Sequence, residues 1–178
     1  MNRLHAAPAN EAEGHAAQLY AAIKGAIGMV PNAYVGIGSN SPIALEAGLH
    51  LDAALKKSTL SGQEIEAVKL AASQVSECEY CLAAHTAISK LHGLSAEAIV
   101  ALRHGQASGN PKLDALAAFT RTLVNGKGSV PNEALEAVRR AGYTDAQIVD
   151  TALAITSITF TNLFNRINNT PLDFPAAA

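Results

Sequence analysis

The stretch that decides this chain is Cys78-Glu79-Tyr80-Cys81-Leu82-Ala83-Ala84-His85. It holds the only two cysteines among the 178 residues. On a helix, Cys78, Cys81 and His85 fall at positions i, i+3 and i+7, so their side chains share one face. A thiol pair beside a base is suited to thiol–disulfide chemistry. The same three residues also fit part of a zinc site, so the surrounding sequence has to separate the two.

The residues just before the motif have the pattern of a capping box, Ser76-Glu77-Cys78-Glu79. This pattern predicts a helix with Ser76 as its N-cap and Cys78 at its second position. The positive end of the helix favours a thiolate there, whereas the two flanking glutamates oppose it. Because His85 lies one turn after Cys81, we interpret Cys81 as the thiol with a base. Cys78 is then the more exposed, resolving or partner-facing thiol.

A histidine base works best when a carboxylate orients it, and Glu66 on the preceding predicted helix is the candidate. Glu66 lies at the margin of that helix's apolar stripe. We expect the tight connection at Ser76 to fold the two helices together and to bring Glu66 toward His85. On pattern alone, however, a solvated acid paired with Lys69 at i+3 is the stronger interpretation of Glu66.

Other interpretations of the motif stay open. The cysteines also fit two small buried hydrophobes, and His85 a satisfied core histidine. A closed zinc site lacks a second CxxC or an HxxxH, and haem attachment needs a histidine where Leu82 stands. Tyr80 faces away from the Cys/His row by its spacing, so packing is favoured over a role as an acid near the pocket.

The rest of the sequence is typical of an all-α protein. Alanine and leucine dominate, and β-branched runs with period two are absent. We expect one compact domain over residues 1–178 with about eight helices, an N-terminal arm over residues 1–28 and an extended C-terminal tail over residues 169–178. Residues 29–40, rich in Gly, Pro and Asn, are predicted to be a long loop. The expected helices cover residues 10–26, 42–57, 62–75, 77–92, 96–104, 111–125, 132–141 and 145–168.

The sequence also contains a pattern that fits a degenerate internal repeat. Ser61, Glu64, Ile65, Leu70 and Ala71 align at a constant offset with Thr144, Gln147, Ile148, Leu153 and Ala154. The same offset sets Thr161, Phe164 and Asn168 opposite Cys78, Cys81 and His85. A second copy that kept the scaffold and lost the chemistry explains this, and so does coincidence between two capping boxes.

Composition limits the class of partner. Hydrophobic residues make up 49% of the chain and charged residues 16%, which favours surface covered by copies of the same chain. The formal net charge of −2 gives no general attraction to nucleic acid or to anionic lipid. No apolar stretch has the length of a membrane span, and the first residues lack an apolar signal core. We therefore expect a cytoplasmic protein, in which a lone CxxC is catalytic or metal-binding rather than structural.

The spacing of Glu66, Cys78, Cys81 and His85 resembles the Glu…CxxCxxxH signature of the alkylhydroperoxidase AhpD-like group of the carboxymuconolactone decarboxylase superfamily. Flanking phrases resemble its peroxidase-related branch, so that the resemblance covers most of residues 28 to 175. These phrases are Met29-Val30-Pro31-Asn32 with Ser41-Pro42, and Asn162-Leu163-Phe164-Asn165 followed by Pro171-Leu172-Asp173-Phe174-Pro175.

The resemblance implies an all-α fold assembled as homotrimers or homohexamers, with no cofactor beyond a redox-active Cys78–Cys81 disulfide. It implies that Cys81 attacks a hydroperoxide, that Glu66 and His85 relay its proton, and that Cys78 then closes the disulfide. Better-known members have a second histidine between the cysteines, where this chain has Tyr80, which leaves Tyr80 as an accessory candidate. Lactone decarboxylation is not expected, because the decarboxylase branch lacks the cysteine pair.

The resulting hypothesis is a thiol-dependent hydroperoxide reductase that an external dithiol reduces. Two alternatives remain from the sequence: an oligomer that senses redox state without catalysis, and a CxxC/His metal-binding module.

Overall fold

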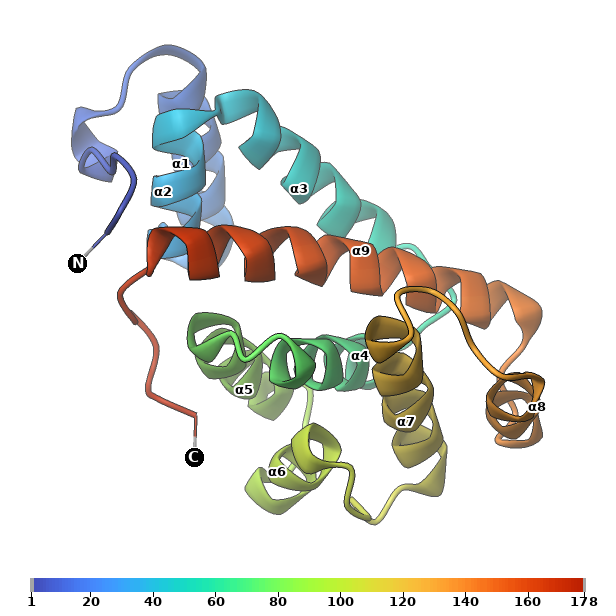
Figure 1. The fold of residues 1–178 in the computed structure, drawn as a ribbon. Helices are drawn as coiled ribbons and strands as arrows, with labels where there is room; N and C mark the ends of the chain where they lie inside the picture. Colours follow the sequence, from blue (N-terminus) through green and yellow to red (C-terminus); the bar gives the residue numbers. More distant parts are fainter. Residues whose placement is uncertain (1, 178) are drawn as a thin grey trace.

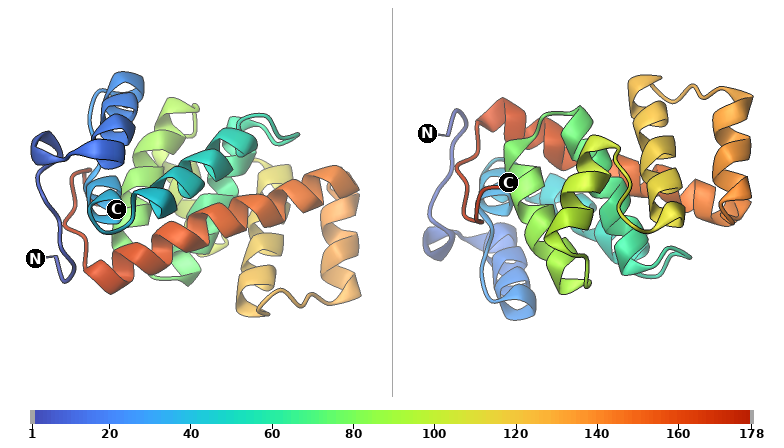
Figure 2. Two further views of the ribbon diagram at one scale, coloured as in Figure 1. Left: turned by 90° about the horizontal axis from the view of Figure 1, so that it is seen from above. Right: turned by 90° about the horizontal axis from the view of Figure 1, so that it is seen from below.

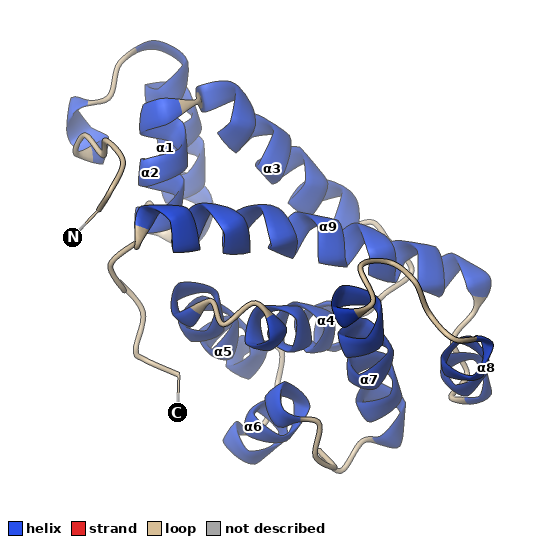
Figure 3. Ribbon diagram, in the orientation of Figure 1, coloured by secondary structure: helices blue, strands red, loops and turns tan. Residues whose placement is uncertain are grey.

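The computed structural model describes residues 2–177, which fold into nine α-helices and one short 3-10 turn with no strand among them (Figures 1 and 3). The all-α prediction is confirmed. The two outermost residues of the expected arm and tail, 1 and 178, lie outside the described part. After the 3-10 turn Ala9–Glu11, the helices are α1 Gly14–Ile27, α2 Asn32–Asn40, α3 Pro42–Leu55, α4 Gly62–Val75, α5 Glu79–Leu91, α6 Ala96–His104, α7 Pro111–Asn125, α8 Asn132–Arg140 and α9 Asp145–Asn168.

Most helix starts lie where the capping residues predict them. Ser61 and Thr144 each form a complete capping box, with Glu64 and Gln147 returning the hydrogen bond. Ser41 caps α3 immediately before a proline at its first position, and Asn110 does the same for α7. The local sequence therefore determines where these four helices begin.

The prediction of a loop over residues 29–40 is wrong for residues 32–40, which form α2. The glycines there serve packing rather than turns. A Cβ added to Gly36 would lie 2.8 Å from the ring of Phe164, and one added to Gly38 would lie 2.5 Å from the hydroxyl oxygen of Tyr20. Both glycines are buried. They let α2 approach α9 and α1 closely. Glycine also lowers the helix propensity of the segment, which is why the sequence predicted a loop there.

The capping box predicted at residues 76–79 is also wrong. Ser76 is the C-cap of α4, Glu77 adopts a left-handed conformation with φ of 50°, and Cys78 is the N-cap of α5. The backbone N–H of Cys78 donates to the carbonyl of Ser73 at 3.1 Å, the bond that closes a Schellman-type helix end. Three residues, Ser76, Glu77 and Cys78, thus separate the two helices, and the thiol of Cys78 lies at this junction.

Helices α4 and α9 form the centre of the molecule. α4 packs against α5, α6, α7 and α9, and its side chains Val68 and Leu70 are fully buried. Figure 2 shows α9 running along the length of the molecule, with the N-terminal helices near one end and α7 and α8 near the other. The tail after α9 turns back past the start of α5 (Figure 1).

No helix within residues 2–177 combines the length and the apolar character needed to cross a membrane.

Candidate active site

The two cysteines lie at the start of α5 and are joined by a hydrogen bond from a backbone N–H to a thiol sulfur. The N–H of Cys81 donates to Sγ of Cys78 at 3.3 Å, so the thiol acts as the N-cap of the helix. Both residues are free thiols and buried, with exposed fractions of 1% for Cys78 and 2% for Cys81. The expectation that Cys78 is the more exposed of the two is therefore wrong, because the tail and α9 cover the helix start.

Cys78 nevertheless borders the large pocket of this region, whose volume is about 520 Å³. We call it the α5–α9 pocket. It lies between the turn that joins α4 to α5, the end of α9 and the C-terminal tail, with Glu77, Arg166 and Leu172 among its walls. Both cysteines also pack in one apolar cluster with Ala72 and Ile158.

The two thiols have opposite electrostatic environments. The hydrogen bond between the two side chains, the N–H of Cys81 and the charge of Arg166 together lower the pKa of Cys78, against the effect of burial. The hydrogen bond with Cys78 and burial together raise the pKa of Cys81, although Asn165 Nδ2 donates to its sulfur at 3.4 Å. When the pair loses one proton, the negative charge is therefore held on Cys78.

Glu66 and His85 form the predicted contact. Oε2 of Glu66 lies 2.8 Å from Nδ1 of His85, and the two side chains are 5% and 12% exposed. The interpretation of Glu66 as a solvated acid paired with Lys69 is wrong, because Nζ of Lys69 binds Asp52 at 2.8 Å instead. His85 follows Cys81 by one turn of α5, so the structure joins all four residues of the sequence signature into one region.

Tyr80 anchors the tail. Its hydroxyl donates to Oδ1 of Asp173 at 2.7 Å and accepts the N–H of Ala33 at 3.2 Å. Its ring meets that of Phe174 edge to face, with centroids 5.8 Å apart. Burial is the main cause that raises the pKa of Tyr80, with the Asp173 carboxylate adding to it. These contacts agree with the preference for packing over acid chemistry at this position.

Three residues on α9 support the thiol pair, and the motif itself did not reveal them. Asn162 accepts from Ser73 Oγ at 3.1 Å and donates to Ser76 Oγ at 3.2 Å. Arg166 donates to the carbonyls of Ser76 and Glu77. Asn165 is the third, through its contact with Cys81. The phrase Asn162-Leu163-Phe164-Asn165, which carried part of the family resemblance, was the available signal.

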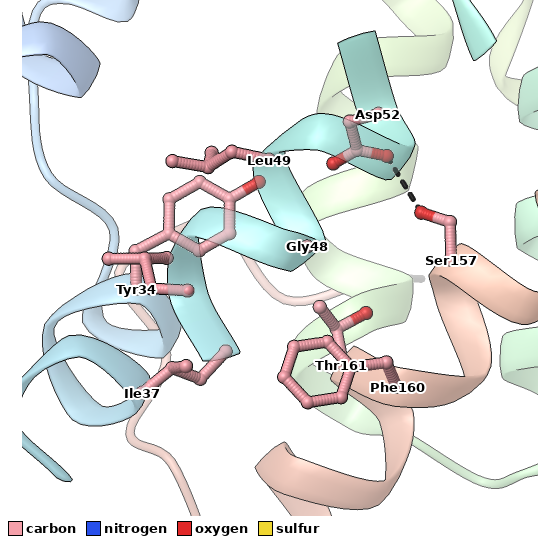
Figure 4. Close-up of a pocket in the computed structure, with 9 residues that line it drawn as sticks. Tyr34, Ile37, Gly48, Leu49, Asp52, Ser157, Phe160 and Thr161 are labelled. Carbon is pink, nitrogen blue, oxygen red and sulfur yellow. Dashed lines mark hydrogen bonds between the residues drawn. The ribbon is translucent and has the colours of Figure 1, made fainter. Parts of the chain in front are cut away.

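A second polar cluster, centred on Asp52 of α3, lies between α3, α4 and α9. Oδ1 of Asp52 accepts from Lys69 at 2.8 Å and from Ser157 Oγ at 2.7 Å. Tyr34 is hydrogen-bonded to the same carboxylate, and burial is the main cause that raises its pKa. Asp52 and Tyr34 line a cavity of about 10 Å³, which is room for about one water molecule (Figure 4). No sequence motif singles out Asp52, because a lone acid on a helix looks like a surface residue.

Within residues 2–177, no three His, Cys, Asp or Glu side chains are arranged so that they can hold a metal ion.

Comparison with known proteins agrees with this geometry. The model of the carboxymuconolactone decarboxylase family matches residues 44–122, which include Glu66, both cysteines and His85. A search of curated proteins gives no match.

Solved structures share the fold at low sequence identity. An uncharacterized peroxidase-related protein with an alkylhydroperoxidase AhpD core, from Ralstonia eutropha JMP134, has a TM-score of 0.86 and 20% identity, over 97% of this chain and 92% of that one. A peroxidase-related protein from Silicibacter sp. TM1040 has a TM-score of 0.78 and 20% identity, over 92% and 88%. The debrominase Bmp8 has a TM-score of 0.79 and 16% identity, over 96% and 92%.

Proposed function

We propose that this chain is a thiol-dependent hydroperoxide reductase with Cys78 and Cys81 as its redox-active pair, since the carboxymuconolactone decarboxylase family model matches residues 44–122 and the fold is shared with a peroxidase-related protein that has an AhpD core. One observation carries the proposal. A thiol pair at a helix N-terminus lies one turn from a histidine whose Nδ1 is 2.8 Å from a buried carboxylate. Two cysteines that served only in packing would not require a buried Glu66–His85 hydrogen bond beside them.

The proposed reaction uses one hydroperoxide and both thiols. One thiolate attacks the outer peroxide oxygen, the O–O bond breaks, and the alkoxide takes up a proton to leave as an alcohol. The resulting sulfenic acid condenses with the second thiol, which gives a Cys78–Cys81 disulfide and water. An external dithiol then reduces this disulfide by exchange and becomes oxidised itself.

Glu66 and His85 supply the proton transfers in this scheme. The carboxylate fixes the orientation of the imidazole through Nδ1, which leaves Nε2 to take up and return a proton. Burial of both side chains keeps water from competing for these hydrogen bonds. No metal or organic cofactor is required, since both electrons come from the thiols.

The proposal extends to the partners of the reaction. They are a hydroperoxide, a protein or small dithiol as reductant, and further copies of the chain in a trimer or hexamer, in the cytoplasm, without nucleic acid or membrane. Exposed apolar side chains support assembly, among them Leu163 and Ile167, which lie one turn apart on α9.

Steady-state consumption of peroxide with a panel of dithiol reductants tests this function. We expect turnover by the wild type, none by Cys81→Ser, and a strong decrease for Glu66→Gln. Glu133→Gln, which changes an exposed acid in the first turn of α8, is the matched control and leaves turnover unchanged. Full turnover by Cys81→Ser contradicts the proposal. Slow wild-type turnover together with a redox-dependent change of oligomer mass favours the non-catalytic redox sensor instead.

A further inference from the structure

We infer that the side-chain amide of Asn165 binds the outer oxygen of the hydroperoxide and holds it against the sulfur of Cys81. Asn165 is then a substrate-binding residue of α9. This inference rests on the proposed function and deepens it. Three features of the structure support it: an unpartnered carbonyl, a contact with the Cys81 sulfur, and a place in the wall of the α5–α9 pocket.

The first feature is the side-chain carbonyl of Asn165. The residue is 4% exposed, and its Oδ1 is buried without a hydrogen-bond partner among residues 2–177. A buried carbonyl without a partner destabilises a fold, so native proteins keep few of them. Asn162, one turn earlier on α9, has both ends of its amide occupied, by Ser73 and Ser76. Asn165 therefore has a binding group that the fold itself does not use.

The second feature is the contact that the other end of this amide makes. Nδ2 of Asn165 donates to Sγ of Cys81 at 3.4 Å, which keeps Oδ1 of the same planar amide close to that sulfur. A hydroperoxide has the complementary groups, because its outer oxygen is the atom that a sulfur attacks and also carries a hydrogen. Oδ1 accepts this hydrogen while the oxygen lies against Sγ, so one amide binds both reacting atoms.

The third feature is the place of Asn165 in the pocket. Its side chain contacts Cys81 and also belongs to the wall of the α5–α9 pocket, whose volume of about 520 Å³ is large enough for a small organic hydroperoxide. Tyr80 and Leu172 belong to the same wall and suit the organic part of such a substrate. α9 is continuous over 24 residues, and a rigid helix positions a binding group more precisely than a loop does.

The same amide serves before and after the O–O bond breaks. His85 takes up the thiol proton of Cys81, and the sulfur attacks the outer oxygen, which keeps its own hydrogen. The alkoxide receives the proton from His85 and leaves as an alcohol, so that Cys81 becomes a sulfenic acid. Oδ1 then accepts the O–H of this sulfenic acid while Nδ2 stays on the sulfur. The thiol of Cys78 condenses with it, which gives the disulfide and one water molecule.

Two small reagents test this inference on Cys78→Ser, in which Cys81 is the only thiol. Serine is itself a good N-cap, so this background keeps the start of α5. tert-Butyl hydroperoxide carries the O–H that Oδ1 accepts, whereas methyl methanethiosulfonate reacts with a thiolate and has no hydrogen-bond donor. Peptide mass spectrometry of quenched samples gives both rates, with the sulfenic acid trapped by dimedone.

Two substitutions of Asn165 are compared in this background. Asn165→Leu replaces the amide by an apolar group of similar size, and we expect the peroxide rate to fall at least ~10-fold more than the thiosulfonate rate. Asn165→Asp keeps an acceptor oxygen but adds a negative charge beside the sulfur. Both of its rates should fall, while their ratio stays within ~3-fold of that in Cys78→Ser alone.

The outcomes separate this inference from the proposed function. An equal fall of both rates in Asn165→Leu, or no fall in either, overturns the inference and leaves the proposed function intact. A ratio in Asn165→Asp as low as that in Asn165→Leu also overturns it, since an acceptor oxygen then has no effect on the peroxide. If one equivalent of tert-butyl hydroperoxide oxidises neither thiol of the wild type, the inference and the proposed function both fail.

Discussion

Two regions of this molecule begin alike and end differently. α4 and α9 both open with a complete capping box, and they pack against each other in the core. α4 ends after 14 residues, and three residues separate its end from the start of α5. α9 continues without interruption for 24 residues. The interruption after α4 is where the thiols lie.

The difference shows what a helix break provides. Along an unbroken helix such as α9, the backbone N–H groups beyond the first turn are bonded within the helix, so none of these is free to bind a thiolate. The break releases the N–H groups at the start of α5, and one of them binds Cys78. The unbroken helix serves as support, because Asn162, Asn165 and Arg166 all reach from α9 to the break or to Cys81. Whether the two regions are copies of one ancestral repeat stays a prediction.

The largest expected effect is on peroxide turnover, and it concerns His85, the base on α5. His85→Gln removes the group that takes up and returns a proton in the proposed reaction, so we expect peroxide turnover to fall by about 10²-fold or more. Stopped-flow measurement of peroxide consumption checks this. His104→Gln, at the exposed end of α6, is the matched control and keeps wild-type turnover. An equal loss in both variants would mean that His85 acts only through folding.

The next effect concerns the support from α9. Asn162 is 1% exposed and its amide joins the hydroxyls of Ser73 and Ser76, so Asn162→Ala leaves both without this partner. We expect a loss of about 2–3 kcal/mol in the free energy of unfolding, measured by urea titration with circular dichroism. Thr156→Ala, on the exposed face of the same helix, should change it by less than about 0.5 kcal/mol. Similar changes in the free energy of unfolding for the two variants would contradict the supporting role of α9.

A smaller effect is expected from the charge that α9 brings to the break. Arg166→Gln removes one of the causes that lower the pKa of Cys78. The rate of Cys78 alkylation by iodoacetamide, measured against pH, therefore shifts to higher pH. At neutral pH, we expect alkylation to slow by about 3- to 10-fold. Arg139→Gln, which breaks ion pairs to Glu136 and Asp145 at the far end of the molecule, is the control. An unchanged profile in Arg166→Gln would show that the helix end alone sets the thiolate.

The smallest effect concerns the backbone of the break. Glu77 has φ of 50°, a conformation that glycine adopts freely and asparagine adopts more readily than glutamate. Glu77→Gly should raise the free energy of unfolding by about 0.5–1 kcal/mol, and Glu77→Asn by less. The lost ion pair to Arg166 is exposed and costs little. Destabilisation by both substitutions would mean that the glutamate side chain, rather than its strain, matters at the break.

The sequence predicted those parts of the fold and site that local chemistry determines. Ser61 and Thr144 predict the starts of α4 and α9 correctly, because a capping box is a contact between near neighbours in sequence. The Glu66–His85 contact followed from one tight connection between two helices and from the family resemblance, and the structure confirms it.

The sequence misled where tertiary packing overrides local preference. Gly36 and Gly38 looked like loop residues, although α2 uses them to approach α9 and α1. Ser76 and Glu79 looked like a capping box, yet the carbonyl of Ser73 takes the N–H of Cys78 and shifts the helix start by two residues. Arg166 and Asn162 are distant in sequence from the thiols, so no spacing rule connects them.

Thiol counting after a single oxidation tests the central claim most directly, namely that the break between α4 and α5 holds a redox-active thiol pair. The protein is reduced without oxygen, freed of reductant and treated with one equivalent of hydroperoxide. The account predicts that both free thiols disappear together and that mass spectrometry finds one intramolecular Cys78–Cys81 disulfide, lighter by two hydrogen atoms. Persistence of two free thiols per chain while peroxide remains would contradict it.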